Sequence, residues 1–411
     1  MLRNYFKIAI AVLKRRKFFT FISLFGISFT LTILMVMTAF VDKVATDDYP
    51  DRKRERSLYI TNVEERGTKS GGTSSSSPSF YFFDHYVRKL KTPEMMTIFS
   101  RPYNTNTYLD TRKVEIAYKY TDASYWSVLD YAFREGKGYT RQQVENGEAV
   151  VVISEDLKRN YFGAEVNVAG KFVEIEDIKY RVCGVVKSLP PTSYLLYADA
   201  YVPYTTAKSD VRKGTSLRGE YQGIILAKSS GEVGAMNREF EGMASRLQPD
   251  DKIYDVVRTH ADPYIEAYVR TGHEDSSGML YAITAIAVFV LLVMLLPTVN
   301  LININVTRIM ERSSEIGVRK AFGASSRTLV YQFVIENLIL TGLGGLIGVV
   351  FSWIVLRVLN GAELIPNLEL SLNGMVLLYS LAACLVFGLL SGVYPAWRMS
   401  RMNVVSALKA Q

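Results

Sequence analysis

The chain contains few of the residues that form disulfide frameworks, metal centres and catalytic dyads. Only two cysteines and three histidines occur among its 411 residues. Cys183 lies in a polar stretch and Cys384 in an apolar run, so a disulfide bond between them is not expected. His85, His260 and His273 are far apart in the sequence and lack the spacing of zinc ligands. These absences argue against a metal centre and against a small disulfide-stabilised fold.

Motifs for nucleotide binding and hydrolysis are also absent. The sequence has no GxxxxGK(S/T) phosphate loop, no HExxH zinc motif and no GxSxG nucleophile elbow. Acidic residues of the central region, such as Glu155 and Glu174, lie among lysines, and a solvated surface explains them better than a catalytic pair. We therefore expect no catalytic residue, no metal and no directly bound cofactor. Any ATP would be bound by a separate protein.

The positive charge of the chain is unevenly placed. The formal net charge is +8 and the isoelectric point is near 9.1. Lysines and arginines concentrate beside long apolar runs, which is typical of membrane topology signals and not of a nucleic-acid surface. We expect membrane lipid and no nucleic acid among the partners.

Four stretches are long and apolar enough to cross a bilayer, for which about 20 residues are needed. The first begins after a basic segment, 1–17, whose apolar residues recur at helical spacing and predict an amphipathic helix at the membrane surface. The stretches carry almost no charged residues, Glu336 being the main exception. The predicted spans are 18–41, 279–306, 328–357 and 374–397.

The distribution of basic residues predicts the orientation of these spans. With four spans, the basic segments 1–17, 307–327 and 398–411 fall on one side of the membrane, which the positive-inside rule assigns to the cytoplasm. The long region 42–278 and the short loop 358–373 then lie outside. The predicted fold class is a membrane protein with four transmembrane α-helices and a large α+β extracytoplasmic domain between the first and second.

The central region mixes strand and helix signals. Ala149–Ile153 is a β-branched run, followed by Ser154 as a helix N-cap and by Gly163 as a helix stop. Two β-rich stretches that meet at Glu176 and Asp177 predict a hairpin. The Gly- and Ser-rich stretch 67–79 predicts a flexible loop. The elements do not follow a sustained βαβ repeat.

Small residues in the last two predicted spans suggest helix packing. Gly344 with Gly348, and Gly388 with Gly392, form GxxxG pairs that let helix backbones approach closely. Glycine is also simply common in membrane helices, so both interpretations remain open. Glu336, near the start of the third span, is consistent with an interfacial carboxylate or with a proton-handling group.

The charged link Arg308–Arg327 reads RIMERSSEIGVRKAFGASSR. Glu315 and Arg319 are spaced i,i+4 in the favourable order, and Gly323 suits a helix stop. Apolar contacts would come from Ile309, Ile316, Val318 and Phe322. A short amphipathic helix of this kind is consistent with docking to a soluble partner or with a plain connector.

Several stretches resemble the MacB/FtsX-type permeases of ABC transporters. They are ERSSEIGVRKAFGASSRTLVYQFVIENLILTGLGGLIG and the ending SGVYPAWRMSRMNVVSAL. In the central region, VVISEDLKRNYFG and GKFVEIEDIKYRVCGVVKSLP are similar to the MacB-type periplasmic core domain. The resemblance implies four spans, a large domain between the first two, a cytoplasmic coupling helix that docks on a separate or fused ATPase, and work as a homo- or heterodimer. Residues 279–411 would form the FtsX-like permease domain.

The resemblance also supplies candidate site residues. Carried onto this chain, the coupling-helix motif corresponds to Glu311, Arg312, Glu315, Ile316, Gly317, Arg319, Lys320, Gly323 and Ala324. The 411 residues hold no ATPase motif, so we expect a partner ABC ATPase in the cytoplasm, a second permease protomer and a possible extracytoplasmic protein partner.

The predicted function follows from these parts. We expect a multi-pass inner-membrane permease subunit, with both termini cytoplasmic, that transmits ATP-driven motion to its outer domain for export, lipoprotein extraction or mechanical signalling. The alternative is a membrane-anchored extracytoplasmic sensor or scaffold without transport.

Overall fold

The computed structural model describes most of the chain outside its two ends and the charged link. The described residues are 15, 17–45, 49–69, 71–109, 112–270, 275–310, 318, 322, 326–375, 377–383, 385–386 and 389. The chain divides into two compact units. We call them the helical unit (Met1–Lys43, Ile283–Leu364 and Glu369–Gln411) and the large domain (Val44–Ala282 and Ile365–Leu368).

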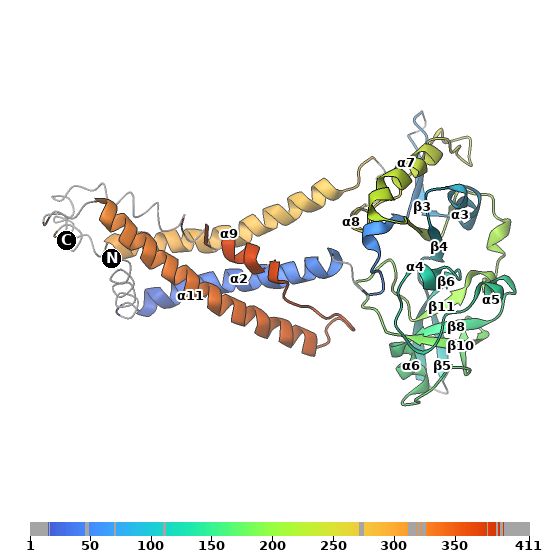
Figure 1. Cartoon of the computed structure of the whole chain (residues 1–411), viewed down its shortest axis with the longest axis horizontal. Helices are drawn as coiled ribbons and strands as arrows, with labels where there is room; N and C mark the ends of the chain where they lie inside the picture. The colour runs from blue at the N-terminus through green and yellow to red at the C-terminus, as the bar shows by residue number, and fades with distance from the viewer. Residues whose placement is uncertain are drawn as a thin grey trace. The chain divides into compact units, whose positions relative to one another are not determined.

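The described part of the helical unit is built on three long helices, α2 (Lys17–Ala45), α9 (Met279–Met310) and α11 (Ser326–Gly361) (Figure 1). Among the described residues, two helical segments are long and apolar enough to cross a membrane, Lys17–Lys43 and Val334–Gly361. The apolar part of α9, Met279–Leu295, is shorter. The predicted segments 1–17 and 398–411, and much of the predicted span 374–397, lie outside the described residues.

The large domain is built on a ten-stranded mixed sheet and a four-stranded antiparallel sheet. In the large sheet the order is β1 (Ser57–Ile60), β13 (Tyr221–Leu226), β4 (Met95–Ser100), β6 (Arg112–Thr121), β11 (Ala200–Pro203), β8 (Val150–Ser154), β10 (Ile178–Val186) and β7 (Phe133–Gly136). β5 (Tyr103–Leu109) pairs with β6, and β9 (Phe172–Ile175) pairs with β10. The small sheet runs β12 (Arg218–Gly219), β3 (Thr73–Pro78), β2 (Val63–Arg66) and β14 (Val256–Thr259).

Helices cover both faces of the large sheet. One core joins the sheet to α3 (Phe80–His85), α6 (Glu155–Phe162) and α7 (Val233–Ala244). The other joins it to α4 (Tyr125–Val128), α5 (Arg141–Glu145) and α8 (Tyr264–Val269). The large domain also has short 3-10 helices, η1 (Arg54–Arg56), η2 (Val87–Lys89), η3 (Tyr204–Thr206), η4 (Val211–Lys213) and η5 (Ser230–Glu232).

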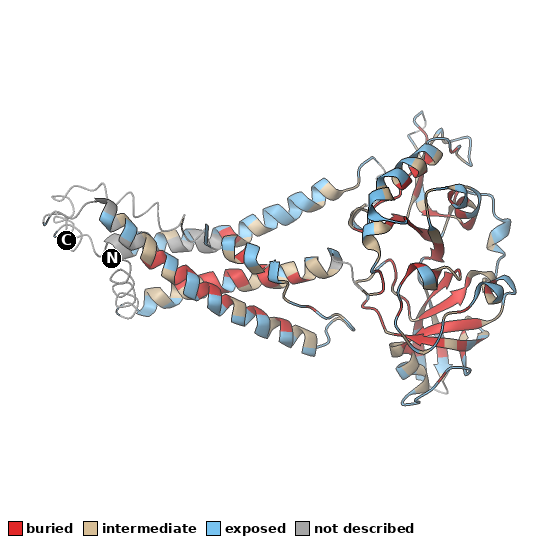
Figure 2. Cartoon of the chain, in the orientation of Figure 1, coloured by how far each residue is buried: buried red, intermediate tan, exposed pale blue. Residues whose placement is uncertain are grey.

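Strand β8 explains this three-layer arrangement. Its Val150-Val151-Val152-Ile153 run is buried throughout, with Val151 and Ile153 in the first core and Val150 and Val152 in the second. A strand that is apolar on both faces must be covered on both faces. Figure 2 shows the buried residues of the large domain concentrated on the strands of the large sheet.

Two local predictions for this region are confirmed. The Ser154 hydroxyl accepts a hydrogen bond from the Leu157 amide at 3.1 Å, and α6 ends at Gly163 with a φ of 68°. β9 and β10 form the predicted hairpin, with Glu176 and Asp177 at φ 54° and 66° in its turn. Both features arise from side-chain chemistry within a few residues along the chain.

The prediction of a flexible loop over 67–79 was wrong over Thr73–Pro78. Residues Thr73–Pro78 form β3, which pairs with β2 on one side and with β12 on the other. The Asn62 amide donates to the Ser75 hydroxyl at 2.7 Å, and the Ser77 hydroxyl donates to the Thr61 carbonyl at 3.1 Å. Serine has little intrinsic strand preference, so β3 depends on its pairing with β2 and β12 and on these side-chain bonds to the connection between β1 and β2.

A buried lysine in β6 predicts a pH-dependent stability. Lys119 is fully buried and its ammonium donates to the Leu195 carbonyl. Burial lowers the pKa of Lys119 from 10.5 to about 7. Between these two values the unfolded chain holds a proton that the folded domain has released, so the stability of the large domain rises with pH in this window. The slope is at most about 1.4 kcal/mol per pH unit.

Lys119→Met is expected to remove this slope. The measurement is the unfolding midpoint of the large domain in wild type and variant, in the lower half of the window, before the tyrosines of the unfolded chain titrate. Lys179→Met, at an exposed position, serves as the control and should keep the wild-type slope. Equal slopes in wild type and Lys119→Met would show that Lys119 does not titrate in this range.

Candidate functional site

The predicted coupling-helix residues lie outside the described part of the chain. They are Glu311, Arg312, Glu315, Ile316, Gly317, Arg319, Lys320, Gly323 and Ala324. Of the four glycines assigned to helix packing, Gly388 and Gly392 also lie outside it, whereas Gly344 and Gly348 lie in α11. The structure therefore describes the helix contact at one glycine pair and the large domain, but not the docking segment.

Helices α2 and α11 each carry a row of buried residues at a spacing of four. The row on α2 is Ser23, Ile27, Leu31, Met35 and Ala39. The row on α11 is Glu336, Leu340, Gly344, Gly348, Ser352 and Leu356. Residues spaced by four form a ridge along a helix, and two such ridges pack into each other's grooves. Glu336, left open between two roles above, is buried at the start of this row with 2% of its surface exposed.

The two helices approach each other closely at the glycine pair. A Cβ atom added at Gly344 would lie 2.8 Å from the Ile27 Cβ, and one added at Gly348 would lie 2.9 Å from the Leu31 Cβ. The Thr32 hydroxyl donates to the Gly348 carbonyl at 3.3 Å across the interface. The close contact is possible because Gly344 and Gly348 have no side chain, as in other small-xxx-small helix pairs.

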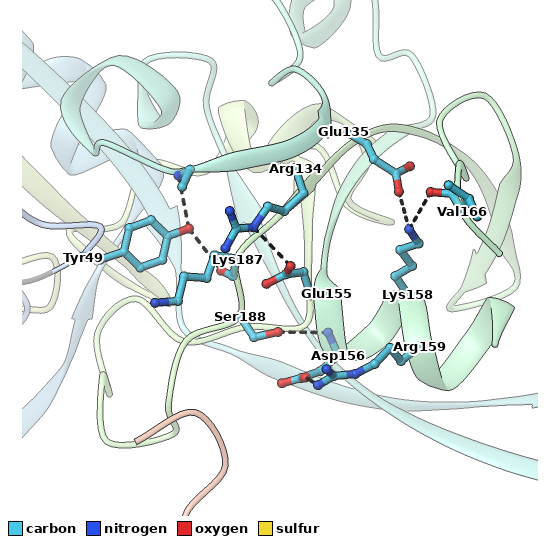
Figure 3. Close-up of polar contacts among 11 residues, drawn as sticks. Tyr49, Arg134, Glu135, Glu155, Asp156, Lys158, Arg159, Val166, Lys187 and Ser188 are labelled. Atoms are coloured by element: carbon cyan, nitrogen blue, oxygen red, sulfur yellow. Dashed lines mark hydrogen bonds and ion pairs between the residues drawn. The ribbon is translucent and has the colours of Figure 1, made fainter. Parts of the chain in front are cut away.

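The large domain receives the chain from α2 through Tyr49–Arg56, which we call the entry segment. The Tyr49 hydroxyl donates to the Lys187 carbonyl at 3.1 Å and accepts from the Ala132 amide at 3.3 Å (Figure 3). Burial raises the pKa of Tyr49 to about 12, so the hydroxyl keeps its proton. The Lys53 ammonium contacts the Asp130 carboxylate at 3.0 Å. These bonds join the entry segment to the residues that precede edge strand β7 and to Lys187, which follows β10.

Edge strand β7 is in turn tied to α6. Arg134 pairs with Glu155 at 3.1 Å, and Glu135 pairs with Lys158 (Figure 3). The Ser188 hydroxyl, next to Lys187, accepts a hydrogen bond at 2.9 Å from the amide of Asp156 in the first turn of α6. The entry segment is therefore bonded to an edge of the large sheet that α6 holds in place.

The chain leaves the large domain through Ala261–Arg270, the exit segment, on the way to α9. The Arg270 guanidinium holds both carboxylate oxygens of Asp262, at 2.6 and 2.7 Å. The two side chains are 7% and 9% exposed, so this bidentate pair is largely removed from water. Further along, Asp275 pairs with Arg66 of β2 at 2.9 Å and also with Arg258 of β14.

The entry and exit segments meet on strand β1. The Tyr59 amide donates to the Asp262 carbonyl at 2.8 Å, and the Asp262 amide donates back at 3.0 Å. The Arg54 guanidinium lies 3.6 Å from the centre of the Tyr264 ring and pairs with Asp51 at 3.0 Å. The Tyr59 hydroxyl donates to the same Asp51 carboxylate at 2.5 Å.

We call these six residues the entry–exit cluster: Asp51, Arg54, Tyr59, Asp262, Tyr264 and Arg270. Burial raises the pKa of Asp51, against the opposing effect of Arg54, and burial also raises the pKa of Tyr59. Tyr59 therefore remains the proton donor in its bond to Asp51. Buried charges that are paired and hydrogen-bonded hold a single geometry, because breaking any one bond leaves another group unpaired.

Sequence reasoning did not identify this cluster. Its members occur in two stretches about two hundred residues apart, and each stretch alone looks like a polar connection between a span and a domain. The only local signal is that arginines and tyrosines, which rarely bury without partners, stand close to the predicted domain boundaries. Among the described residues, no group of three or more His, Cys, Asp or Glu side chains is arranged to hold a metal ion.

Comparison with known families matches most of the chain. The MacB-like periplasmic core domain matches residues 20–243, more than half of the chain. The C-terminal domain of FtsX-like permeases matches residues 287–404. The chain belongs to the MacB/FtsX-type family of ABC transporter permeases. The resemblance inferred from the sequence is confirmed, and the large α+β domain is the family's periplasmic core domain.

The chain spans about half the length of the curated relatives described next. The pyoverdine export ATP-binding/permease protein PvdT of Pseudomonas syringae pv. tomato is 26% identical over 290 residues, which are 71% of this chain and 42% of PvdT. The macrolide export ATP-binding/permease protein MacB of Wolinella succinogenes is 24% identical over 418 residues, 98% of this chain and 60% of that protein. The crystal structure of the periplasmic region of MacB from Actinobacillus actinomycetemcomitans has a TM-score of 0.37 and 16% identity, covering 53% of this chain and 94% of that one.

Proposed function

We propose that this permease subunit receives motion from a separate cytoplasmic ABC ATPase and delivers it to its periplasmic core domain. The observation that supports this most directly is the entry–exit cluster. The exit segment is hydrogen-bonded through Asp262 to Tyr59 of β1, the strand that follows the entry segment, and Arg54 of the entry segment lies against the Tyr264 ring of the exit segment. Because the two ends are joined, movement of α2, which precedes the entry segment, and of α9, which follows the exit segment, would reach the domain as one displacement.

The proposal includes four spans with both termini in the cytoplasm of an inner-membrane protein. The uneven placement of basic residues supports this topology. With four spans, the three basic segments all fall on the same side of the membrane. In this arrangement the segment 307–327 faces the ATPase. A second protomer, as homo- or heterodimer, completes the transporter in the proposal.

The output of the motion is proposed to be mechanical. The rows of α2 and α11 residues that face each other are closely packed, with glycines and aliphatic side chains at their centre. Such packing transmits displacement between helices better than it conducts a polar solute. Export, lipoprotein extraction and activation of a periplasmic partner are the uses of this motion that fit the family.

The ATPase contact is tested in the coupling segment. Glu315→Lys reverses a charge and Gly317→Trp adds bulk, and each is expected to weaken binding of the co-purifying ATPase by roughly tenfold or more, about 1.4 kcal/mol. The measurements are binding of the purified ATPase to the chain in nanodiscs and the stimulation of ATP hydrolysis.

Ser313→Ala, in the same segment but outside the nine carried-over positions, is the matched control and should leave both measurements unchanged. If binding and stimulated hydrolysis survive both Glu315→Lys and Gly317→Trp, the segment is a connector. The membrane-anchored sensor or scaffold would then be the better description.

A further inference from the structure

A small pocket of about 350 Å³ opens in the large domain on the sheet face that α3 covers. We call it the tyrosine pocket. Its lining includes four tyrosines and two charged residues, which are Tyr103, Tyr118, Tyr120, Tyr221, Lys208 and Glu220. The volume is at the lower end of the range of roughly 300–1,000 Å³ that ligand sites occupy, so the pocket suits a small molecule or a single headgroup. It shares no residue with the entry–exit cluster or with the predicted coupling segment.

Strand geometry brings the tyrosine rings together. Tyr118 and Tyr120 are two residues apart on β6 and therefore lie on the same face of the sheet, and Tyr103 of β5 lies directly opposite Tyr118. The Tyr103 and Tyr118 rings are stacked with their centres 5.6 Å apart. The Tyr120 ring stands at 71° to the first and at 83° to the second. The sheet thus fixes an aromatic corner before any ligand binds, which lowers the entropy cost of binding.

The tyrosine pocket is open to a ligand. Lys208 and Glu220 are exposed at its mouth, and Tyr103 is half-buried. The other three tyrosines form the floor, with 5–8% of their surface exposed. Each tyrosine hydroxyl of the lining is either hydrogen-bonded or open to solvent. A small molecule can therefore reach both the phenol groups and the carboxylate.

Glu220 supplies a charge that no ion pair neutralises. Its carboxylate accepts a hydrogen bond from the Tyr103 hydroxyl and makes no ion pair with any residue that the structure describes. The Lys208 ammonium, by contrast, pairs with the Glu176 carboxylate at 2.6 Å. These two carboxylates and one ammonium leave the pocket with a net negative charge. A ligand with a positive group would complement it.

The effect of this negative charge extends to the tyrosines. Burial is the largest cause of the raised pKa of each of the four, so their hydroxyls remain neutral. Glu220 raises the pKa of Tyr103 and of Tyr221 further. Glu176 does the same for the pKa of the two tyrosines of β6, against a smaller opposing effect of Lys208 at one of them. Neutral phenol rings attract a cation over their faces, so the rings and the carboxylates favour the same kind of ligand.

We propose that the tyrosine pocket binds a small organic ammonium ion, with its cationic group between the tyrosine rings and the Glu220 carboxylate. The rings attract the cation, the phenol oxygens accept hydrogen bonds from any N–H group that it carries, and the carboxylate balances its charge. Free amines and phospholipid headgroups share this chemistry, and the experiment separates the two sources. The site goes beyond the proposed motion and does not depend on the ATPase.

The test observes the floor of the tyrosine pocket in the full-length chain. 3-Fluorotyrosine introduced at Tyr221 alone gives a single fluorine resonance. The chain is held in dodecyl maltoside micelles, which carry neither a charge nor an ammonium group. The probe is choline, and its matched control is 3,3-dimethylbutan-1-ol, which has carbon in place of the quaternary nitrogen and so keeps the shape without the charge. A second preparation, in phosphatidylcholine nanodiscs, asks whether a lipid headgroup reaches the same site.

We expect choline to shift the Tyr221 resonance at millimolar concentration. The alcohol should bind about tenfold more weakly, because it forms no cation–π contact with the rings. This comparison uses one protein and two ligands of the same shape, so it does not depend on how any variant folds.

Two substitutions at exposed positions should change choline binding in opposite directions. Glu220→Gln removes the unpaired charge and should weaken binding severalfold. Lys208→Met leaves Glu176 without its partner, which makes the pocket more negative, and should strengthen binding. Damage to the fold would weaken binding in both variants. Glu115→Gln is the matched control and should leave binding unchanged, because Glu115 is exposed on the opposite face of the same strand, β6.

Three results would overturn the proposal. They are equal shifts with choline and with the alcohol, no shift with either, or a change in the same direction in Glu220→Gln and Lys208→Met. A resonance that already has its choline-bound position in phosphatidylcholine nanodiscs identifies a lipid headgroup as the ligand, and an unshifted one identifies a free amine. Because no ATPase is present, a negative result leaves the proposed transmission of motion untouched. Failure of the coupling-segment test would, conversely, leave this site intact.

Discussion

Arg270→Met is expected to destabilise the large domain by about 3–5 kcal/mol, because it leaves the Asp262 carboxylate buried without its partner. The pair is bidentate and both side chains are below 10% exposed, so water cannot easily replace the guanidinium. Denaturant unfolding of the domain, followed by its intrinsic fluorescence, measures the change. The effect should be among the largest for a single substitution in this chain.

A double variant separates the cost of the unpaired charge from the value of the pair. Arg270→Met together with Asp262→Leu removes both charges, and replacing a buried pair by apolar residues is often nearly neutral. Most of the lost stability should therefore return. Arg212→Met is the control, because its partner Asp210 lies in an exposed pair, and it should cost less than about 1 kcal/mol.

Hydrogen exchange locates the damage. In Arg270→Met the amides of Tyr59 and Asp262, which bond to each other's carbonyls, should lose protection first. Protection of β8, in the middle of the sheet, should persist until the domain unfolds globally. If the single variant is as stable as wild type, or if protection falls uniformly, then the entry–exit cluster does not hold the two segments together.

Gly348→Leu is expected to separate α2 from α11. The first atom of the new side chain would lie 2.9 Å from the Leu31 Cβ and 3.0 Å from the Ser28 carbonyl oxygen, so the backbones must move apart. Overpacking of this kind costs roughly 1–3 kcal/mol where the surroundings can adjust. Here part of the obstacle is backbone, which adjusts least, and the hydrogen bond from Thr32 to the Gly348 carbonyl is also lost.

The measurement for this variant is the thermal stability of the chain in detergent, read as the fraction that remains monodisperse after heating. Gly342→Leu is a matched control in the same helix, because a Cβ at Gly342 meets no atom within 4 Å. The control should behave like wild type while Gly348→Leu loses its monodisperse peak at lower temperature. Equal midpoints for the two variants would mean that the glycine pair does not set the helix contact.

Local features of the fold could be predicted with success. The Ser154 cap, the Gly163 stop and the turn at Glu176 and Asp177 depend on residues within a few positions of each other. The strand within the Ser-rich stretch 67–79 could not be predicted, because β3 forms only by pairing with β2 and β12. Glu336 lies within a long apolar run, and its burial depends on tertiary packing that the run itself does not specify.

Features that depend on composition or on short-range spacing were determined by the sequence alone. The lengths of the apolar runs, the placement of basic residues and the motif stretches identified the family, because each depends on composition or on short-range spacing. Tertiary structure alone decided which residues meet across long separations. The contact of Gly348 with Leu31 and the pairing of Tyr59 with Asp262 depend on how strands and helices dock, and no local pattern specifies the partner. The entry–exit cluster belongs to this second class, since it is assembled from segments that become neighbours only when the chain folds.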